Sequence, residues 1–530
     1  MKPILFCAIS IVCYAFPLIA LAQSDIPEKY ASLINRDDLK KHLTIVASAE
    51  MEGRETATPG QKRAAAYIEA QFKQIGLLTL PGLNGYQQSY PLFKDSMVRS
   101  NLSIGKMKFH FGKDYLVSPN SAENALIKSK EIVFVGYGIG DKNYDDYAGK
   151  DVKGKIVVFF TGEPKQDGNY IISGTTKNSN WGGFSGANKK AILAKQKGAL
   201  LALSINPNLD SFTNSALENA KKTNVYYPRP VTKENEKATV AIILPITARI
   251  IFGSAEFDPV LSKAKLATSL LASRLEKNAR IKFDYQKLQI SYSSSNVIGY
   301  LEGSDKKDEF VFLTGHYDHL GKRDNVIYYG ADDDGSGTVS VIEMAQAFAK
   351  AKSEGHGARR SIIFMTVSGE EKGLWGSEYY SDHPLVPLDH TTVDLNTDMV
   401  GRIDPNRKIG DSTNYVYVIG DDKLSSDLKP ISSSVNKKYT NLELDYKFND
   451  PADPERIYFR SDHYNFARKG VPIIFFFDGI HKDYHRPTDT VDKINFDLME
   501  KRVRFIFLIA WNMADRENML KRDIPLVENR

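Results

Sequence analysis

In the C-terminal part of the chain, short apolar segments rich in strand-forming residues alternate with segments of helical spacing. The sequence predicts strands at 310–314, 361–367 and 471–477, and helices at 335–350 and 496–516. This alternation is typical of α/β folds, because each helix returns the chain so that the next strand runs parallel to the last. We therefore expect a three-layer α/β sandwich with a mixed, largely parallel central sheet.

The middle of the chain has a different pattern. Residues 97–290 contain short β-rich runs separated by turns, such as 131–138 and 154–160, and no cluster of chemically reactive residues. This pattern predicts a separate small β-rich domain with a mixed sheet. It would interrupt a larger domain that 23–96 and 291–530 form together.

The N-terminus has the features of a signal peptide over residues 1–22. Lys2 provides a positive start, an apolar stretch follows, and Ala20-Leu21-Ala22 forms a small-x-small cleavage signal. The apolar stretch is short for a membrane span, although an uncleaved N-terminal anchor is the alternative. Both cysteines of the chain, Cys7 and Cys13, lie in this segment. We expect an exported mature chain, periplasmic or extracellular, with no stable membrane span and no thiolate ligand.

The charge of the chain is nearly balanced. It has 70 basic and 65 acidic residues and a formal net charge of +5. Such a balance does not favour nucleic-acid binding, and no basic run with interleaved aromatic residues occurs. The composition therefore predicts no nucleic-acid partner.

Residues that can bind metal ions recur just beyond the predicted strands. They are His316, Asp318, the run Asp332-Asp333-Asp334, Glu370, Glu371, Asp398 and His485. Each has an ordinary structural explanation taken alone, such as a helix N-cap or a solvated acidic face. Their recurrence after apolar strands is not explained in that way. Because the carboxyl ends of parallel strands share one edge of a sheet, these side chains are expected to form one site.

The chemistry of the set points to zinc. Imidazoles and carboxylates without a thiolate suit Zn²⁺ with nitrogen and oxygen ligands. Two divalent ions that share a carboxylate can hold a hydroxide nucleophile between them. A carboxylate next to a metal ligand can act as a general base, and the pair Glu370-Glu371 offers one residue for each role.

Five motifs, in this order along the chain, resemble the M28 family of zinc peptidases. They are Gly315–Gly321 (GHYDHLG), Gly330–Gly337 (GADDDGSG), Ser368–Glu371 (SGEE), Asn396–Gly401 (NTDMVG) and Tyr484–Thr490 (YHRPTDT). The resemblance extends to Met51–Arg54 (MEGR) and the helix after it. Residues 97–290, with VGYG at 135–138 and YDDY at 144–147, look like the protease-associated (PA) domain often inserted in this family, where it would act as a lid.

The resemblance implies two zinc ions per chain. Asp333 would bridge them, His316 and Asp398 would complete one site, and Glu371 and His485 would complete the other. The family usually also has a cis peptide bond after the bridging residue, which corresponds here to Asp333–Asp334.

The resemblance also implies roles outside the ligand set. Glu370 would be the general base, and Asp318 would orient His316 without binding metal. Tyr484 would either hydrogen-bond the oxyanion or simply pack. The pattern requires no ligand from His319 or His481, so neither is expected to bind metal. Ser461 and Asp462 match a recurring family segment but receive no role.

The function that follows is an exopeptidase that removes N-terminal residues from peptides, that is, an aminopeptidase. A carboxypeptidase or dipeptidase on the same fold is the alternative. A glutaminyl cyclase with one zinc, or a binding protein without activity, fits less well, because the full ligand set and the base are present.

Overall fold

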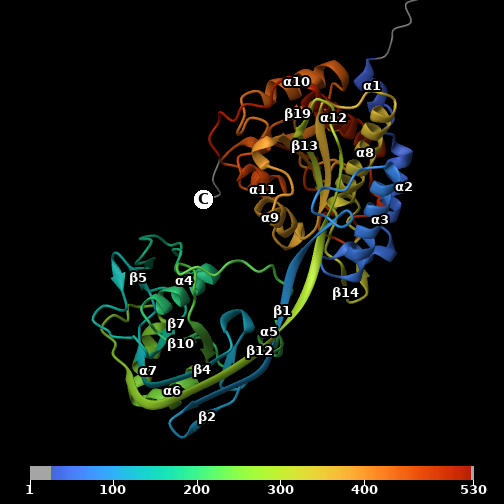
Figure 1. Cartoon of the computed structure of the whole chain (residues 1–530). Coiled ribbons are helices and arrows are strands. Elements are labelled where there is room, and N and C mark those ends of the chain that lie inside the picture. Colours follow the sequence, from blue (N-terminus) through green and yellow to red (C-terminus); the bar gives the residue numbers. More distant parts are fainter. Residues whose placement is uncertain (1–24, 527–530) are drawn as a thin grey trace, which may run out of the picture. The chain divides into compact units, whose positions relative to one another are not determined.

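The computed structural model of the chain describes residues 25–526. They divide into two compact units (Figure 1). One comprises the chain up to Gln88 and from Ser295 onward, and the other is Ser89–Ser294. The sequence predicts these boundaries at 96/97 and 290/291. The predicted signal peptide, 1–22, lies outside the described residues. Over 25–526, the structure contains no helix of the length and apolarity that a membrane crossing requires.

The first unit is built on a mixed sheet. Its strand order is β19 (Glu443–Asp445), β18 (Tyr415–Ile419), β20 (Ile473–Phe477), β17 (Thr391–Thr397), β13 (Lys306–His316), β16 (Arg360–Val367) and the last residues of β12 (Glu276–Leu301). The four central strands β20, β17, β13 and β16 are parallel, whereas β12 runs antiparallel to β16 and β18 runs antiparallel to β20. The largely parallel sheet predicted from the sequence is confirmed.

Two hydrophobic cores lie on opposite faces of this sheet, because successive side chains of a strand alternate between faces. Val311 and Leu313 belong to one core, whereas Phe310 and Phe312 belong to the other. The first core is covered by α1 (Ile26–Ala31), α2 (Arg36–Val46), α3 (Pro59–Ile75), α8 (Gly337–Ser353), α10 (Leu428–Tyr439) and α12 (Phe496–Asp515), and the second by α9 (Trp375–Asp382) and α11 (His463–Ala467). Figure 1 shows α2, α3 and α8 on one side of this unit and α9 and α11 on the other. The three-layer sandwich is therefore confirmed.

Helix α3 illustrates how local sequence sets the ends of an element. Thr58 caps its first turn by accepting a hydrogen bond from the backbone N–H of Gln61, and Pro59 occupies the first helical position, where no N–H is needed. Gly76 ends the helix with φ of 85°, a left-handed conformation that glycine adopts without strain. Both ends of α3 therefore lie at residues that typically begin and end helices.

The second unit also contains a mixed sheet. Strands β4 (Ala125–Phe134), β7 (Ile156–Phe160), β10 (Leu201–Ile205) and β11 (Thr239–Ile243) are parallel, and β3 (Tyr115–Val117) and the first part of β12 run antiparallel at its edges. Strand β1 (Gln87–Ile104) pairs with β2 (Met107–Phe109). The helices are α4 (Gly183–Gln196), α5 (Asn214–Lys221), α6 (Pro245–Phe252) and α7 (Ser254–Lys265). The PA assignment of this unit stays a prediction.

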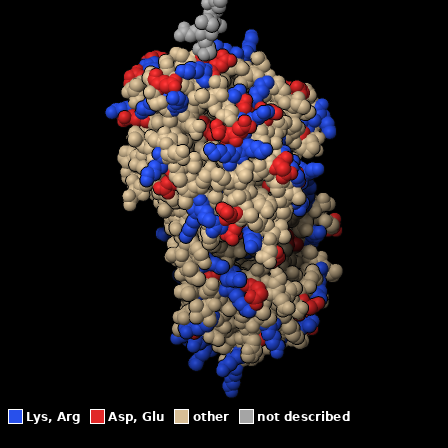
Figure 2. Space-filling model, turned by 90° about the vertical axis from the view of Figure 1, so that its right-hand side faces the viewer, with Lys and Arg blue, Asp and Glu red and all other residues tan. Residues whose placement is uncertain are grey.

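Charged side chains are interspersed on the molecular surface. On the face shown in Figure 2, basic and acidic residues are scattered among uncharged ones. This distribution agrees with the nearly balanced composition. The absence of a nucleic-acid partner remains a prediction.

Candidate metal centre

The ends of neighbouring strands bring the first predicted ligands together. His316 is the last residue of β13, Glu370 and Glu371 lie in a short turn after β16, and Asp398 directly follows β17. Since β13 is parallel to both β16 and β17, these three strands end at the same edge of the sheet. The structure thus brings these residues together at the edge of the sheet that the sequence predicts.

Asp333 lies between two imidazoles. It belongs to the turn at Ala331–Ser336 that leads into α8, and the Asp333–Asp334 peptide bond is cis, as the resemblance implied. Its Oδ1 lies 3.3 Å from Nε2 of His316, and its Oδ2 lies 3.1 Å from Nε2 of His485. One carboxylate therefore faces both histidines, which is the arrangement that a bridging ligand requires.

The other two carboxylates each accompany one histidine. Oδ1 of Asp398 lies 3.6 Å from Nε2 of His316, and Oε2 of Glu371 lies 3.1 Å from Nε2 of His485. All five residues predicted as ligands are thus close together. They form two half-sites that meet at Asp333.

Several buried polar atoms of this cluster have no hydrogen-bond partner within the described part of the chain. They are Nε2 of His316, Oδ2 of Asp333, Oε1 of Glu371 and both ring nitrogens of His319. A buried polar atom without a partner costs free energy, so each one needs an explanation such as a bound ion. Nitrogen and oxygen donors that converge without thiolates fit zinc.

Asp318 holds His316 and Glu370 from outside this cluster. Nδ1 of His316 lies 3.0 Å from the backbone oxygen of Asp318 and 3.6 Å from its carboxylate, so the closer contact is to the main chain. The carboxylate accepts hydrogen bonds from Oγ1 of Thr56, at 2.5 Å, and from the backbone N–H of Glu370, at 3.2 Å. Asp318 thereby couples the strand end of His316 to the turn of Glu370.

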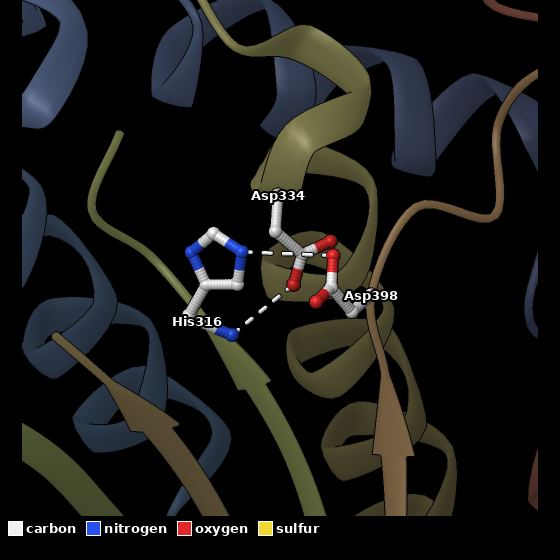
Figure 3. Close-up of side chains that lie close together, drawn as sticks. All are labelled: His316, Asp334 and Asp398. Carbon is white, nitrogen blue, oxygen red and sulfur yellow. Dashed lines mark hydrogen bonds and ion pairs between the residues drawn. The ribbon is translucent and has the colours of Figure 1, made fainter. Parts of the chain in front are cut away.

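Asp334 also approaches His316 and Asp398 (Figure 3), and these three residues could hold an ion. Its carboxylate, however, already accepts hydrogen bonds from three backbone N–H groups. They come from His316 at 3.1 Å, Gly337 at 2.8 Å and Met399 at 3.0 Å. This use of both oxygens suits a structural role in joining the two strand ends to the start of α8.

Two further side chains hold the predicted ligands in place. Oγ of Ser461 donates a hydrogen bond to Oδ2 of Asp398 at 2.6 Å, which leaves Oδ1 directed toward His316. Oδ2 of Asp489 accepts a hydrogen bond from the backbone N–H of Asp333 at 3.2 Å. The motifs predict no role for Ser461, although the segment containing it resembles a recurring family segment.

The two histidines expected not to bind metal differ in position. Nε2 of His481 lies 3.2 Å from Oδ2 of Asp332, which is not one of the predicted ligands. His319 instead lies inside the cluster, with Nδ1 2.8 Å from Oε1 of Glu371 and 3.8 Å from Oδ2 of Asp333. The expectation that His319 binds no metal stays a prediction, although its ring lies beside two of the predicted ligands. The GHYDHLG motif contains this residue but does not indicate which way its ring turns.

Arg54, from the MEGR motif, is a buried cation beneath the ligand-bearing loops. Its guanidinium donates hydrogen bonds to four backbone oxygens, those of Val46, Tyr317, Tyr329 and Gly330, at 2.7–2.9 Å. Tyr317 follows His316, and Gly330 begins the turn that carries Asp333. Arg54 thus ties together the two loops that supply these ligands, a role that the motif alone does not reveal.

Replacing Arg54 by Met should lower the free energy of unfolding by about 3 kcal/mol or more, because several buried carbonyl groups lose their donor. Arg63→Met is the matched control, since Arg63 is 44% exposed and its guanidinium contacts the Glu52 carboxylate at 2.6 Å and the backbone oxygen of Glu50 at 2.7 Å. That change should cost less than about 1 kcal/mol. Urea unfolding of the two variants measures the difference, and equal midpoints would contradict the role of Arg54.

The pKa values of the histidines and carboxylates in this cluster are shifted by burial and by one another. Burial disfavours the charged form of His485, but close pairing with the Asp333 and Glu371 carboxylates raises the pKa of this imidazole to about 10. Burial raises the pKa of Asp333, but His316 and His485 outweigh it and hold that pKa well below its ordinary value. Burial raises the pKa of Glu370 well above its ordinary value, opposed by His316 and reinforced by Glu371. The imidazoles and carboxylates of the cluster thus shift each other's pKa values in opposite directions.

A cavity opens over Asp333, Glu370 and Asp398. Its remaining walls are mostly apolar and comprise Met399, Ile457, Phe475, Phe477 and Ile480, together with Arg460 and Tyr484. The ring of Tyr484 stacks on that of His485 with a centroid distance of 3.9 Å, and its hydroxyl accepts a hydrogen bond from Arg460 at 3.3 Å. The cavity therefore combines reactive carboxylates with an apolar surface.

Comparison with known proteins agrees with this geometry. Residues 296–509 match the sequence profile of Peptidase family M28. This part of the chain is an M28 peptidase domain. All five ligands predicted from the motifs lie within it, and the resemblance to this family is confirmed over these residues.

Individual relatives carry aminopeptidase names. The chain is 28% identical over 190 residues to Leucine aminopeptidase 1 of Penicillium rubens, which covers 35% of this chain and 47% of the relative. It is 25% identical over 308 residues to Aminopeptidase YwaD of Bacillus subtilis, covering 54% and 61%. The chain spans about half the length of the first curated relatives it matches. Among solved structures, an aminopeptidase from Aneurinibacillus sp. strain AM-1 aligns with a TM-score of 0.49 at 18% identity, covering 95% of this chain and 98% of the other.

Proposed function

We propose that the chain is an exported exopeptidase that hydrolyses N-terminal residues from peptides at a centre of two zinc ions. The observation that carries the proposal is the Asp333 carboxylate, which faces His316 with one oxygen and His485 with the other. The M28 domain and the aminopeptidase names of the relatives support the reaction class. The predicted N-terminal signal peptide supports export to the periplasm or the exterior.

In this proposal Asp333 is shared by both ions. His316 and Asp398 complete one half-site, and Glu371 and His485 complete the other. Zinc ions bound there would supply a hydroxide nucleophile at neutral pH and polarise the scissile carbonyl. The unpartnered buried atoms of His316, Asp333 and Glu371 support their use as ligands.

Glu370 would act as the general base. Its carboxylate lines the same cavity as Asp333 and Asp398, and Oε2 lies 3.9 Å from Nε2 of His316. It would accept the proton of the attacking water and then deliver a proton to the leaving amine. The presence of this base beside a complete ligand set argues for an enzyme rather than a binding protein.

The cavity walls indicate how a peptide would be held. The apolar residues, which include Met399, Phe475 and Phe477, favour an apolar side chain at the cleaved residue. Tyr484 lines the same cavity, and its hydroxyl would donate a hydrogen bond to the oxyanion that develops during attack. Acidic groups near the centre would attract the free α-amine of the substrate.

The proposed substrate class is tested by measuring hydrolysis of a leucine-led tripeptide and of its N-acetylated form, each with zinc and with a chelator. We expect cleavage of the free peptide only, and loss of that cleavage on chelation. Cleavage of both peptides would contradict recognition of the free amine. Cleavage that survives chelation would contradict metal dependence.

Arg460 favours a second candidate, a dipeptidase or carboxypeptidase. Its side chain is 38% exposed and lines the cavity beside Tyr484. A guanidinium binds a carboxylate with paired hydrogen bonds, so Arg460 could hold the C-terminus of a short peptide. C-terminal amidation of the same tripeptide tests this: an aminopeptidase should cleave the amide nearly as fast, whereas the second candidate requires a large loss.

Ser461→Ala should weaken zinc binding at the half-site of His316 and Asp398 by about 10- to 100-fold, the range found when a residue that orients a metal ligand is removed. The reason is that Asp398 loses the hydrogen bond that directs its other oxygen inward. Ser461→Thr keeps the hydroxyl and should restore most of the affinity. Competition with a chelator measures both variants, and equal affinities for Ser461→Ala and the unaltered protein would refute the role.

A further inference from the structure

His319 is placed where a metal ligand would be, although the family pattern does not require one there. Its side chain is fully buried, and neither ring nitrogen has a hydrogen-bond partner among the described residues. A buried imidazole without any partner is uncommon in a folded protein. The two ring nitrogens therefore need a binding partner, such as a metal ion.

The neighbours of the ring are two of the predicted ligands. Nδ1 of His319 lies 2.8 Å from Oε1 of Glu371 and 3.8 Å from Oδ2 of Asp333. His319, Asp333 and Glu371 each offer one donor atom, and these atoms all lie within 4.8 Å of one another. Such a spacing is compatible with coordination of one ion by all three.

The short contact between His319 and Glu371 is not aligned as a hydrogen bond. Although Nδ1 and Oε1 are 2.8 Å apart, each remains without a hydrogen-bond partner, as does Oδ2 of Asp333. The geometry therefore favours coordination over a hydrogen bond.

The backbone of Gly330 fixes the orientation of the ring. A Cβ at this position would lie 2.4 Å from Cγ and 2.5 Å from Cδ2 of His319, so only glycine allows the ring to sit there. Gly330 also has φ of 55°, in the left-handed region. The same turn carries Asp333, so the ring and the bridging carboxylate are held by one structural element.

We propose that His319 is a further ligand of the zinc ion at the Glu371 half-site, joining Asp333, Glu371 and His485. This half-site then has two imidazoles and two carboxylates, whereas the other has one imidazole. The inference rests on the proposed two-zinc centre. It predicts that the Glu371 half-site holds zinc more tightly than the ligand set implied by the resemblance would.

The test is stepwise zinc titration of the metal-free protein against a competing chelator. His319→Ala should weaken one of the two binding steps by more than about 100-fold, beyond the range for loss of a residue that only orients a ligand. His319→Asn is the decisive variant, because its amide nitrogen stands where Nδ1 stands and can donate a hydrogen bond but is a poor zinc ligand. It should bind zinc as weakly as His319→Ala.

His42→Asn is the matched control. This histidine is also buried, but it pairs with Glu343 at 3.3 Å and with the hydroxyl of Tyr67 at 2.6 Å, away from the centre. Its replacement should leave both zinc steps unchanged. Recovery of full affinity in His319→Asn, or no loss in His319→Ala, would overturn the assignment.

If a variant does not fold, a crystal structure of the unaltered protein with zinc still tests whether His319 is a ligand. The assignment predicts a distance of about 2.0–2.1 Å between zinc and Nδ1 of His319. A distance above about 3 Å would overturn it while leaving the proposed function intact. If the unaltered protein bound no zinc, both the inference and the proposed function would fall.

Discussion

Glu370→Gln should lower kcat for a leucine-led peptide by about 100- to 10,000-fold, the range expected for loss of a general base. The amide keeps the size of the side chain but cannot accept the proton of the attacking water. Zinc content should stay the same, because Glu370 is not among the proposed ligands. Steady-state kinetics and elemental analysis on the same sample measure the two quantities.

Glu302→Gln is the control for this change, since Glu302 is exposed and lies outside the cavity. It should retain full activity. Full activity in Glu370→Gln would refute its assignment as the base. Loss of zinc together with activity would instead mean that Glu370 is a ligand.

Asp333→Asn should remove the shared ligand and therefore affect both ions. We expect zinc affinity to fall by more than the roughly 10- to 100-fold caused by changes outside the coordination sphere, and activity to fall with it. The physical reason is that an amide lacks the charge and the second oxygen with which Asp333 faces His316 and His485. Calorimetric zinc titration separates the two binding steps.

The control for Asp333 is Asp389→Asn, because Asp389 is an exposed acidic residue outside the cluster. Zinc binding should be unaffected there. If Asp333→Asn weakened only one of the two steps, the residue would be an ordinary ligand of one ion. The bridging role would then be wrong.

The parallel sheet could be predicted because its central strands are short apolar runs. Strands β13, β16 and β20 and helices α8 and α12 lie where the sequence places them, to within a few residues. The edge that carries the chemistry follows from the same pattern. Parallel neighbours end together, so the residues after each strand meet.

Strands that contain many polar residues are harder to recognise from the sequence. All residues of β17 are buried, yet several are polar, which hides the hydrophobic pattern. They are tolerated because they are paired: Oγ1 of Thr314 donates hydrogen bonds to Asp394 at 2.8 Å and to Asn396 at 2.9 Å. Such pairing between strands is not visible in a single sequence. The long strand β12 was missed for a related reason, since its middle residues are mostly exposed and polar.

The identity of the site residues could be inferred from motifs, but their orientation could not. Nothing in the sequence shows that the His319 ring turns toward Glu371 or that the Ser461 hydroxyl reaches Asp398. Both depend on where separate loops cross at the sheet edge. The role of Arg54 could not be predicted either, because its hydrogen-bond partners are backbone oxygens, which a motif of side chains does not indicate.

The central claim is a two-zinc centre that performs hydrolysis, and the most direct test is to add zinc stepwise to the metal-free protein while measuring turnover of the leucine-led tripeptide. The account predicts that about two zinc ions bind per chain and that turnover appears as the centre fills. Full turnover without bound zinc, or two bound ions with no hydrolysis of any free-amine peptide, would contradict it.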